Sequence, residues 1–60
     1  MKQDHFGRVI QDGQPVAQVM ASTRESMLAE IGHYAAVYGQ DGPIKIETRW
    51  GKSRWKEYQP

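Results

Sequence analysis

The chain has 60 residues, with eight cations against seven anions for a formal net charge of +1, and it contains no cysteine. A chain of this size buries only about 60% of the surface that its unfolded form exposes, so we expect one small domain over residues 1–60 with a thin core. The lack of thiols excludes disulfides and cysteine-ligated metals. No stretch approaches the ~20 apolar residues that span a bilayer, and the first residues lack the apolar run of a signal peptide. We therefore expect a soluble, cytoplasmic protein.

The charge is unevenly distributed along the chain. Residues 45–60 carry five cations and two anions, a net of +3, whereas residues 1–44 carry three cations and five anions, a net of −2. A basic balance over a whole chain indicates a nucleic-acid partner, and a local excess such as this one is a weaker indication of the same kind.

The N-terminal third has the pattern of a β-hairpin. Residues 5–11 and 16–21 are rich in strand-forming side chains, and they flank Asp12 and Gly13, a pair that is typical of a two-residue hairpin turn. The hairpin is therefore expected to lead directly into the segment that follows residue 21.

Two registers are open for this hairpin. The preferred one places Phe6, Arg8 and Ile10 on the face that packs against a helix, and it requires Arg8 to extend its charged group to water from the edge of that face. A bulged turn would place Gly7 and Val9 on that face instead. We prefer the first register because it buries two large apolar side chains.

The central segment has the spacing of an amphipathic helix over 23–38. Ser22 and Glu25 fit a capping box, in which the serine hydroxyl accepts the Glu25 amide proton. Downstream, apolar residues recur at i, i+3 and i+4 over an arc of roughly 120°, the width of a face packed on a core. These residues are Met27, Leu28, Ile31, Tyr34, Ala35 and Tyr38. Gly39 stands where a left-handed residue ends a helix, and Pro43 prevents its continuation.

The opposite face of this helix carries Ala29, His33, Ala36 and Val37. A patch of small residues with one histidine is a possible second partner face, for a partner helix or for a homodimer. The simpler interpretation is an ordinary solvent-exposed face. Gly32 costs the helix ~1 kcal/mol relative to alanine, so we expect a packing reason for it.

The C-terminal third has the pattern of a second hairpin. Residues 44–50 alternate apolar and charged side chains, as in a half-buried strand. Gly51 and Lys52 suit a type II′ turn with glycine first, which returns the chain as residues 53–58 with Trp55 facing the core. We therefore expect a second antiparallel strand pair at this end of the chain.

These elements predict an α+β fold of order ββαββ, with one helix packed on a four-stranded antiparallel sheet. The strand order 2-1-3-4 makes every connection without a crossing, while the order 1-2-4-3 and a swapped dimer remain open. We expect Trp50 and Trp55 in the core or at its rim.

The predicted C-terminal hairpin gathers charged side chains on the sheet face away from the helix. A two-residue turn places Arg49 opposite Arg54 and Glu47 opposite Lys56. Like charges across a ladder are mildly destabilising, so an anion or solvent screening has to offset the arginine pair. Guanidinium groups suit phosphate oxygens and aromatic rings stack on bases, although a solvated edge hairpin that discourages aggregation is the simpler interpretation. The candidate partner- or anion-binding residues are Lys45, Arg49, Lys52, Arg54, Lys56 and Tyr58.

Residue types that carry catalysis are scattered. His5 and His33 lie on different predicted elements, without the spacing of a metal set. Catalysis also requires a concave pocket with a supporting shell, which one helix on four strands hardly provides. We expect no enzyme activity, no metal and no cofactor.

The segment YGQDGPIKIETRWGKSRWKEY resembles small open reading frames of phages and prophages. The chain is also similar in architecture to certain anti-CRISPR proteins, which are short, cysteine-free chains with a helix on a small antiparallel sheet and a tryptophan-bearing C-terminal hairpin. This resemblance implies a phage or mobile-element inhibitor that blocks a bacterial defence complex in the host cytoplasm. DNA mimicry would need a strongly acidic face that the sequence lacks, so the resemblance favours a steric blocker of a host protein or ribonucleoprotein complex.

Two alternative functions stay open. One is a small nucleic-acid-binding protein that uses Arg49, Lys52, Arg54 and Lys56, for which about four phosphate contacts predict a steep loss of affinity with salt. The other is a homo-oligomeric structural subunit that assembles through the outer face of the helix or through a sheet edge.

Overall fold

The computed structural model describes residues 2–59. Within them the chain forms four strands and one helix in the order ββαββ, which confirms the expected α+β class. The elements are β1 (His5–Gln11), β2 (Gln14–Ala21), α1 (Arg24–Gly39), β3 (Lys45–Trp50) and β4 (Lys56–Tyr58).

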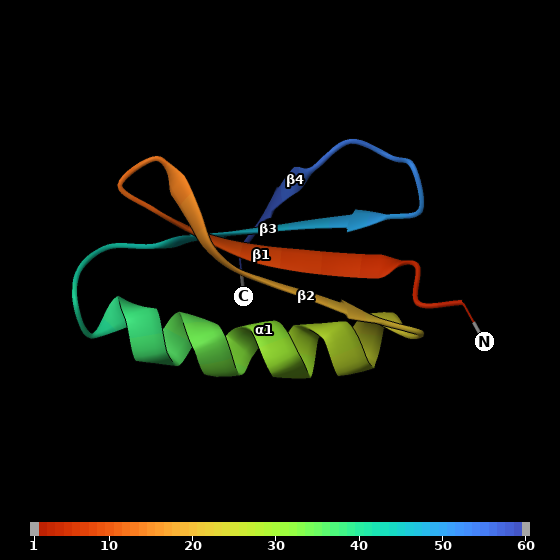
Figure 1. The fold of residues 1–60 in the computed structure, drawn as a ribbon, viewed down its shortest axis with the longest axis horizontal. Coiled ribbons are helices and arrows are strands. Elements are labelled where there is room, and N and C mark those ends of the chain that lie inside the picture. The colour runs from red at the N-terminus through yellow and green to blue at the C-terminus, as the bar shows by residue number, and fades with distance from the viewer. Residues whose placement is uncertain (1, 60) are drawn as a thin grey trace.

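The strands form one antiparallel sheet in the order β2-β1-β3-β4, as the sequence predicted. Figure 1 shows α1 running along the β1 and β2 side of this sheet, with β4 at the far edge. The helix packs on β1 and β2 about equally and barely reaches β3. The sheet is therefore wider than the helix that covers it, and the β3–β4 end of the helix side is left open.

The core is small. Among the described residues, the buried apolar side chains are Val9, Ala21, Met27 and Ile31. The two helix residues lie directly over β1, and a Cβ added to Gly7 would come within 2.8 Å of the Met27 sulfur. Partly buried apolar residues surround this centre: Val16, Ala17, Val19, Leu28, Ala35, Tyr38, Ile44 and Ile46. The predicted core face of the helix is thus confirmed except at one position, because Tyr34 is 41% exposed.

The first hairpin contains a bulge that the sequence did not reveal. Asp12 and Gly13 form the predicted two-residue turn, with φ of 54° and 76°. The pairing then shifts by one residue between Val9 and Ile10, where Val16 is an extra residue on β2. A one-residue shift in an antiparallel pair turns the following side chains to the opposite face.

This bulge overturns the preferred register. Gly7 and Val9 face the helix, whereas Phe6, Arg8 and Ile10 lie on the face away from it, which we call the open face. The physical reason is the arginine. β1 is a central strand, so a guanidinium group under the helix would lose its water without reaching an edge, at a cost of several kcal/mol.

The second hairpin departs from the prediction in the same way. Gly51 has a φ of 60°, and the Ser53 N–H donates to the Trp50 carbonyl oxygen at 3.1 Å, as expected for a two-residue turn with glycine first. The ladder resumes between Thr48 and Lys56, one residue later than predicted. The strand β4 therefore presents the opposite faces from those expected.

The helix begins and ends one residue later than predicted. Thr23 is the N-cap, and its Oγ1 accepts a hydrogen bond from the Ser26 N–H at 3.1 Å, so the capping box proposed at Ser22 is wrong. Gly39 belongs to the helix and does not adopt a positive φ. Gln40 instead caps the helix in a right-handed conformation, and its N–H donates to the carbonyl oxygens of Val37 and Tyr38.

Candidate functional site

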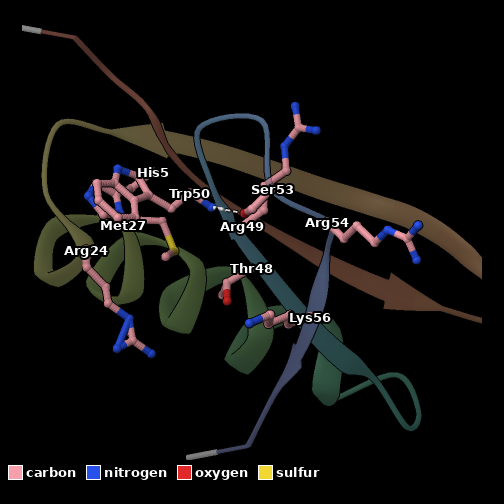
Figure 2. A pocket seen from close by; sticks show the side chains of 9 residues that line it. All are labelled: His5, Arg24, Met27, Thr48, Arg49, Trp50, Ser53, Arg54 and Lys56. Atoms are coloured by element: carbon pink, nitrogen blue, oxygen red, sulfur yellow. Dashed lines mark hydrogen bonds between the residues drawn. The ribbon is translucent and has the colours of Figure 1, made fainter.

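A cleft of about 350 Å³ lies beside the N-terminal end of α1, over the uncovered end of β3 and β4. Nine residues line it (Figure 2): His5, Arg24, Met27, Thr48, Arg49, Trp50, Ser53, Arg54 and Lys56. Four of the nine are arginine or lysine and none is aspartate or glutamate. The guanidinium groups of Arg49 and Arg54 point elsewhere, so Arg24 and Lys56 make the cleft electropositive. We call it the Trp50 cleft.

Trp50 is the most exposed large apolar side chain among the described residues, with 65% of its surface accessible. Its ring stacks on the His5 ring, with the centroids 5.6 Å apart and the planes 5° from parallel. Its Nε1 donates a hydrogen bond to Asp4 Oδ2 at 3.2 Å. The expectation that Trp50 lies in the core or at its rim is therefore wrong, because the helix does not extend over this end of β3. An exposed ring held in one orientation is a platform for stacking.

Backbone contacts hold the strand end that carries Trp50. The Gly51 N–H donates to the Asp4 carbonyl oxygen at 2.7 Å, which ties the N-terminal segment to the turn. On the other side, the Trp50 N–H donates to Ser53 Oγ at 3.1 Å, as the dashed line in Figure 2 shows. The turn and the N-terminal segment together fix the position of the indole without covering it.

Two cations approach the cleft from different elements. Arg24 is the first residue of α1, and its guanidinium carbon lies 5.8 Å from the centroid of the Tyr58 ring. Lys56 is the first residue of β4 and pairs with Thr48 across the ladder. In Figure 2 the Arg24 and Lys56 side chains flank Thr48, while the Arg54 side chain points away from them. An anion placed above Thr48 would lie between two positive charges.

Arg24 also stands at an unfavourable place for a cation. The first turn of a helix carries a partial positive charge from its free N–H groups, so a cation there destabilises the helix by about 0.3–1 kcal/mol. An anion in the adjacent cleft would remove that cost. The sequence carried this signal, an arginine directly after the N-cap, although our interpretation did not use it.

The predicted pair of facing arginines does not exist. Arg54 belongs to the loop before β4. Arg49 lies on the open face as predicted, but its guanidinium carbon is 4.8 Å from the Phe6 ring centroid and 5.1 Å from that of Trp55. Its Nε is buried and has no hydrogen-bond partner among the described residues. Contacts of this kind contribute about 0.5–2 kcal/mol each, so Arg49 helps to hold the open face together.

Arg8 completes this open-face cluster. Its Nε and Nη2 lie 2.7 Å and 2.6 Å from Glu47 Oε1, and its guanidinium carbon lies 4.2 Å from the centroid of the Trp55 ring. Trp55 therefore packs on the face opposite to the one predicted. Glu47 stands opposite Glu57 rather than Lys56, so the expected cross-strand ion pair is wrong. The ion pair with Arg8 offsets the repulsion between the two glutamates.

The six predicted binding residues do not share one surface. They divide among the open face, the loop before β4 and the helix side of the sheet: Lys45 and Arg49, Lys52 and Arg54, and Lys56 and Tyr58, respectively. Of these, Lys56 points into the Trp50 cleft (Figure 2). The sequence interpretation missed Arg24 and His5. The pairing of His5 with Trp50 depends on the register between β1 and β3, which the sequence did not predict.

The second predicted partner face is exposed along its whole length. Its residues are Ala29, His33, Ala36 and Val37. Val37 is 48% exposed, and the neighbouring Tyr34 ring stands edge-on to His33 with the centroids 5.5 Å apart. The packing reason expected for Gly32 is wrong, because a Cβ there would meet nothing within 4 Å.

No group of three or more His, Asp or Glu side chains within residues 2–59 is arranged to hold a metal ion. In the same part of the chain, no helix combines the length and the apolar character needed to cross a bilayer. Fold and cleft together define a small α+β protein with an electropositive, tryptophan-bearing cleft. Comparison with protein-family models, with curated proteins and with solved structures gives no match.

Proposed function

We propose that this protein is a non-enzymatic binding module that holds a single-stranded nucleic acid in the Trp50 cleft. The observation that carries the proposal is the exposed Trp50 ring. Burying a side chain of this size stabilises a fold by a few kcal/mol, so leaving it 65% exposed forgoes stability in a chain with a very small core. A ligand that stacks on the ring recovers that contribution on binding.

The lining residues suit the two parts of a nucleotide. A base stacks on the indole, which His5 and Asp4 hold in place, and such stacking is worth about 1–3 kcal/mol per base. A phosphate group lies between Arg24 and Lys56, where the Thr48 hydroxyl is available as a hydrogen-bond donor. A cleft of about 350 Å³ falls within the range of small-ligand sites.

Replacing Trp50 tests the stacking platform. We expect Trp50→Ala to weaken binding of a short fluorescent oligonucleotide, DNA or RNA, by about 5- to 150-fold, the equivalent of one lost stacked base. Trp50→Phe should retain most of the affinity. Fluorescence anisotropy at low salt measures both, and circular dichroism checks that the variants stay folded. Absence of binding by the native chain, or equal binding by Trp50→Ala, would remove the proposal.

The salt dependence tests the two cations. Two phosphate contacts predict that log K falls with log[salt] at a slope of roughly −1.4, and Lys56→Ala should reduce that slope by about 0.7. The matched control is Lys45→Ala, an exposed lysine on the open face that should leave affinity and slope unchanged. Poly-glutamate tests for an acidic protein partner. If it binds as tightly as the oligonucleotide, and if Trp50→Ala does not weaken its binding, the site contacts an acidic protein surface instead.

The cleft also supports the role that the sequence resemblance implies. We propose as a second candidate that the protein is a phage or mobile-element inhibitor of a bacterial defence complex, acting in the host cytoplasm by steric blocking. The supporting observation is the electropositive Trp50 cleft, which suits the nucleic acid or an acidic surface of a ribonucleoprotein. A pull-down from host lysate should recover a stoichiometric complex, and nuclease treatment distinguishes a protein contact from a nucleic-acid tether. Repeated recovery of no partner would count against this role.

A further inference from the structure

The two edges of the sheet differ in a way that bears on self-association. The edge strand β2 has eight residues and none of them is charged, whereas β4 has three residues that include Lys56 and Glu57. Charged side chains and short length are the usual protection of an edge strand against pairing with another strand. The β4 edge has both protections and the β2 edge has neither. A proline and a bulge, which also protect edges, are confined to the first three residues of β2.

Exposed apolar side chains lie on both sides of the β2 edge. Met20 pairs with Phe6 and so lies on the open face, whereas Tyr34 and Val37 lie on the flank of the helix beside β2. Met20 on β2 is 54% exposed, and Tyr34 and Val37 on α1 are 41% and 48% exposed. Two shallow depressions that share Ala29 and Glu30 connect Met20 to Tyr34. Three of the four exposed large apolar side chains among the described residues therefore lie at the β2 edge or on the helix flank next to it.

We propose that this surface binds a second copy of the chain, with β2 pairing antiparallel to β2 of the partner about a two-fold axis. The absence of charge is the first reason for this choice of partner. A two-fold contact brings each residue near its own copy, so any charged side chain close to the axis would meet a like charge. A strand without charges avoids that repulsion in the ladder, and it offers no complementary charge to an acidic or basic foreign protein. The charge that the contact has to accommodate is the exposed Glu30 on the helix flank.

The position of the helix is the second reason. α1 packs about equally on β1 and β2, so its axis lies roughly half a strand spacing from β2, or about 2.4 Å. The two-fold axis lies another half spacing beyond the edge. The two helices of such a dimer are then about 10 Å apart, which is the upper end of normal helix-packing distances of 8–10 Å. Pairing through β4 would leave them roughly 29 Å apart by the same calculation.

The sequence of β2 limits where the two copies pair. Pro15 lacks a backbone N–H, and the bulge at Val16 interrupts the ladder, so the regular part of the edge is residues 17–21. The helix-side residues in this part are small or β-branched, which leaves room for the two helices to approach. Figure 1 shows β2 and α1 together at one edge of the sheet, with β4 at the other. Both Trp50 clefts of the dimer would therefore stay open, and a strand long enough to reach both would be held twice.

The test is the oligomeric state across concentration. Sedimentation equilibrium from micromolar to millimolar protein should show a monomer–dimer equilibrium. Met20→Lys places like charges close to the two-fold axis, and Val37→Lys places a charge on the helix flank that faces the partner helix. Each should raise the dissociation constant at least ~10-fold. Ala36→Lys adds the same charge at an exposed helix position outside the surface, and it should leave the dimer intact. Circular dichroism checks that each variant is folded, and the two variants act on different elements, so misfolding of one leaves the other informative.

Three outcomes would overturn the inference. A native chain that remains monomeric throughout does so directly, and so does a dimer that Met20→Lys and Val37→Lys both leave unchanged. The third is a native chain that stays monomeric and buries Met20 and Val37 from solvent only when a foreign protein is added. Oligonucleotide binding by a strictly monomeric chain would defeat the dimer and leave the proposed function standing, so the two proposals fail independently.

Discussion

At the scale of single residues, two glycines show how the surrounding side chains determine what a residue contributes to the stability of the fold. Gly7 lies under the helix, where a Cβ would be 2.8 Å from the Met27 sulfur and 3.3 Å from Ile31 Cβ. Gly32 lies on the exposed side of α1, with nothing within 4 Å of the same added atom. The first glycine permits the close packing of helix on sheet, whereas the second only raises the entropy of the unfolded chain.

Alanine at these two positions should therefore have opposite effects. Gly32→Ala should raise the free energy of unfolding by up to ~1 kcal/mol, since it removes a poor helix former. Gly7→Ala should lower it by about 1–2 kcal/mol, because Met27 can rotate away but Ile31 Cβ is fixed to the helix backbone. Urea unfolding midpoints at constant m measure both. Shifts of the same sign would show that the helix does not rest on Gly7 as described.

At the scale of elements, periodicity and turn chemistry predicted the five elements, their order and both two-residue turns. Each hairpin nevertheless holds one extra residue after its turn, Val16 in β2 and one in the loop before β4. Alternation along a strand does not show where a bulge will fall, because the bulge depends on which faces the finished fold can bury. The predicted placement of the six candidate residues on one sheet face was therefore wrong where it depended on register, and the Trp50 cleft was not predicted.

The helix N-terminus gives a direct test at this scale. Thr23 Oγ1 accepts the Ser26 N–H, whereas the sequence pattern had favoured Ser22 as the cap. Thr23→Ala should lower the free energy of unfolding by about 1 kcal/mol, and Ser22→Ala should change it by less than ~0.5 kcal/mol. The two substitutions remove one hydroxyl each from adjacent positions, so they control for one another in thermal unfolding. A larger effect at Ser22 would restore the capping box.

At the scale of the whole molecule, stability is limited by the size of the core. A chain of 60 residues is expected to have about 3–9 kcal/mol of stability in all. Its buried centre is a few side chains between one helix and a central strand, and the open-face cluster of Arg8, Arg49 and Trp55 adds contacts on the other side of the sheet. Association through β2 would add burial in the place where the monomer leaves apolar side chains exposed.

The Tm of the native chain and of Ile31→Ala at two protein concentrations shows how much stability comes from the core and how much from association. Ile31 is 1% exposed, so its truncation leaves a cavity and should cost about 2–5 kcal/mol, a large share of the total. If the native chain is a dimer, a tenfold increase in concentration should raise its Tm by roughly 3–6 °C, because association favours only the folded state. The same tenfold increase in concentration should raise the Tm of Ile31→Ala by a similar amount, since that substitution does not touch the β2 edge. The Tm of Met20→Lys should stay constant. Scanning calorimetry at two concentrations measures all three, and a native Tm that is independent of concentration would mean that the core supports the monomer unaided.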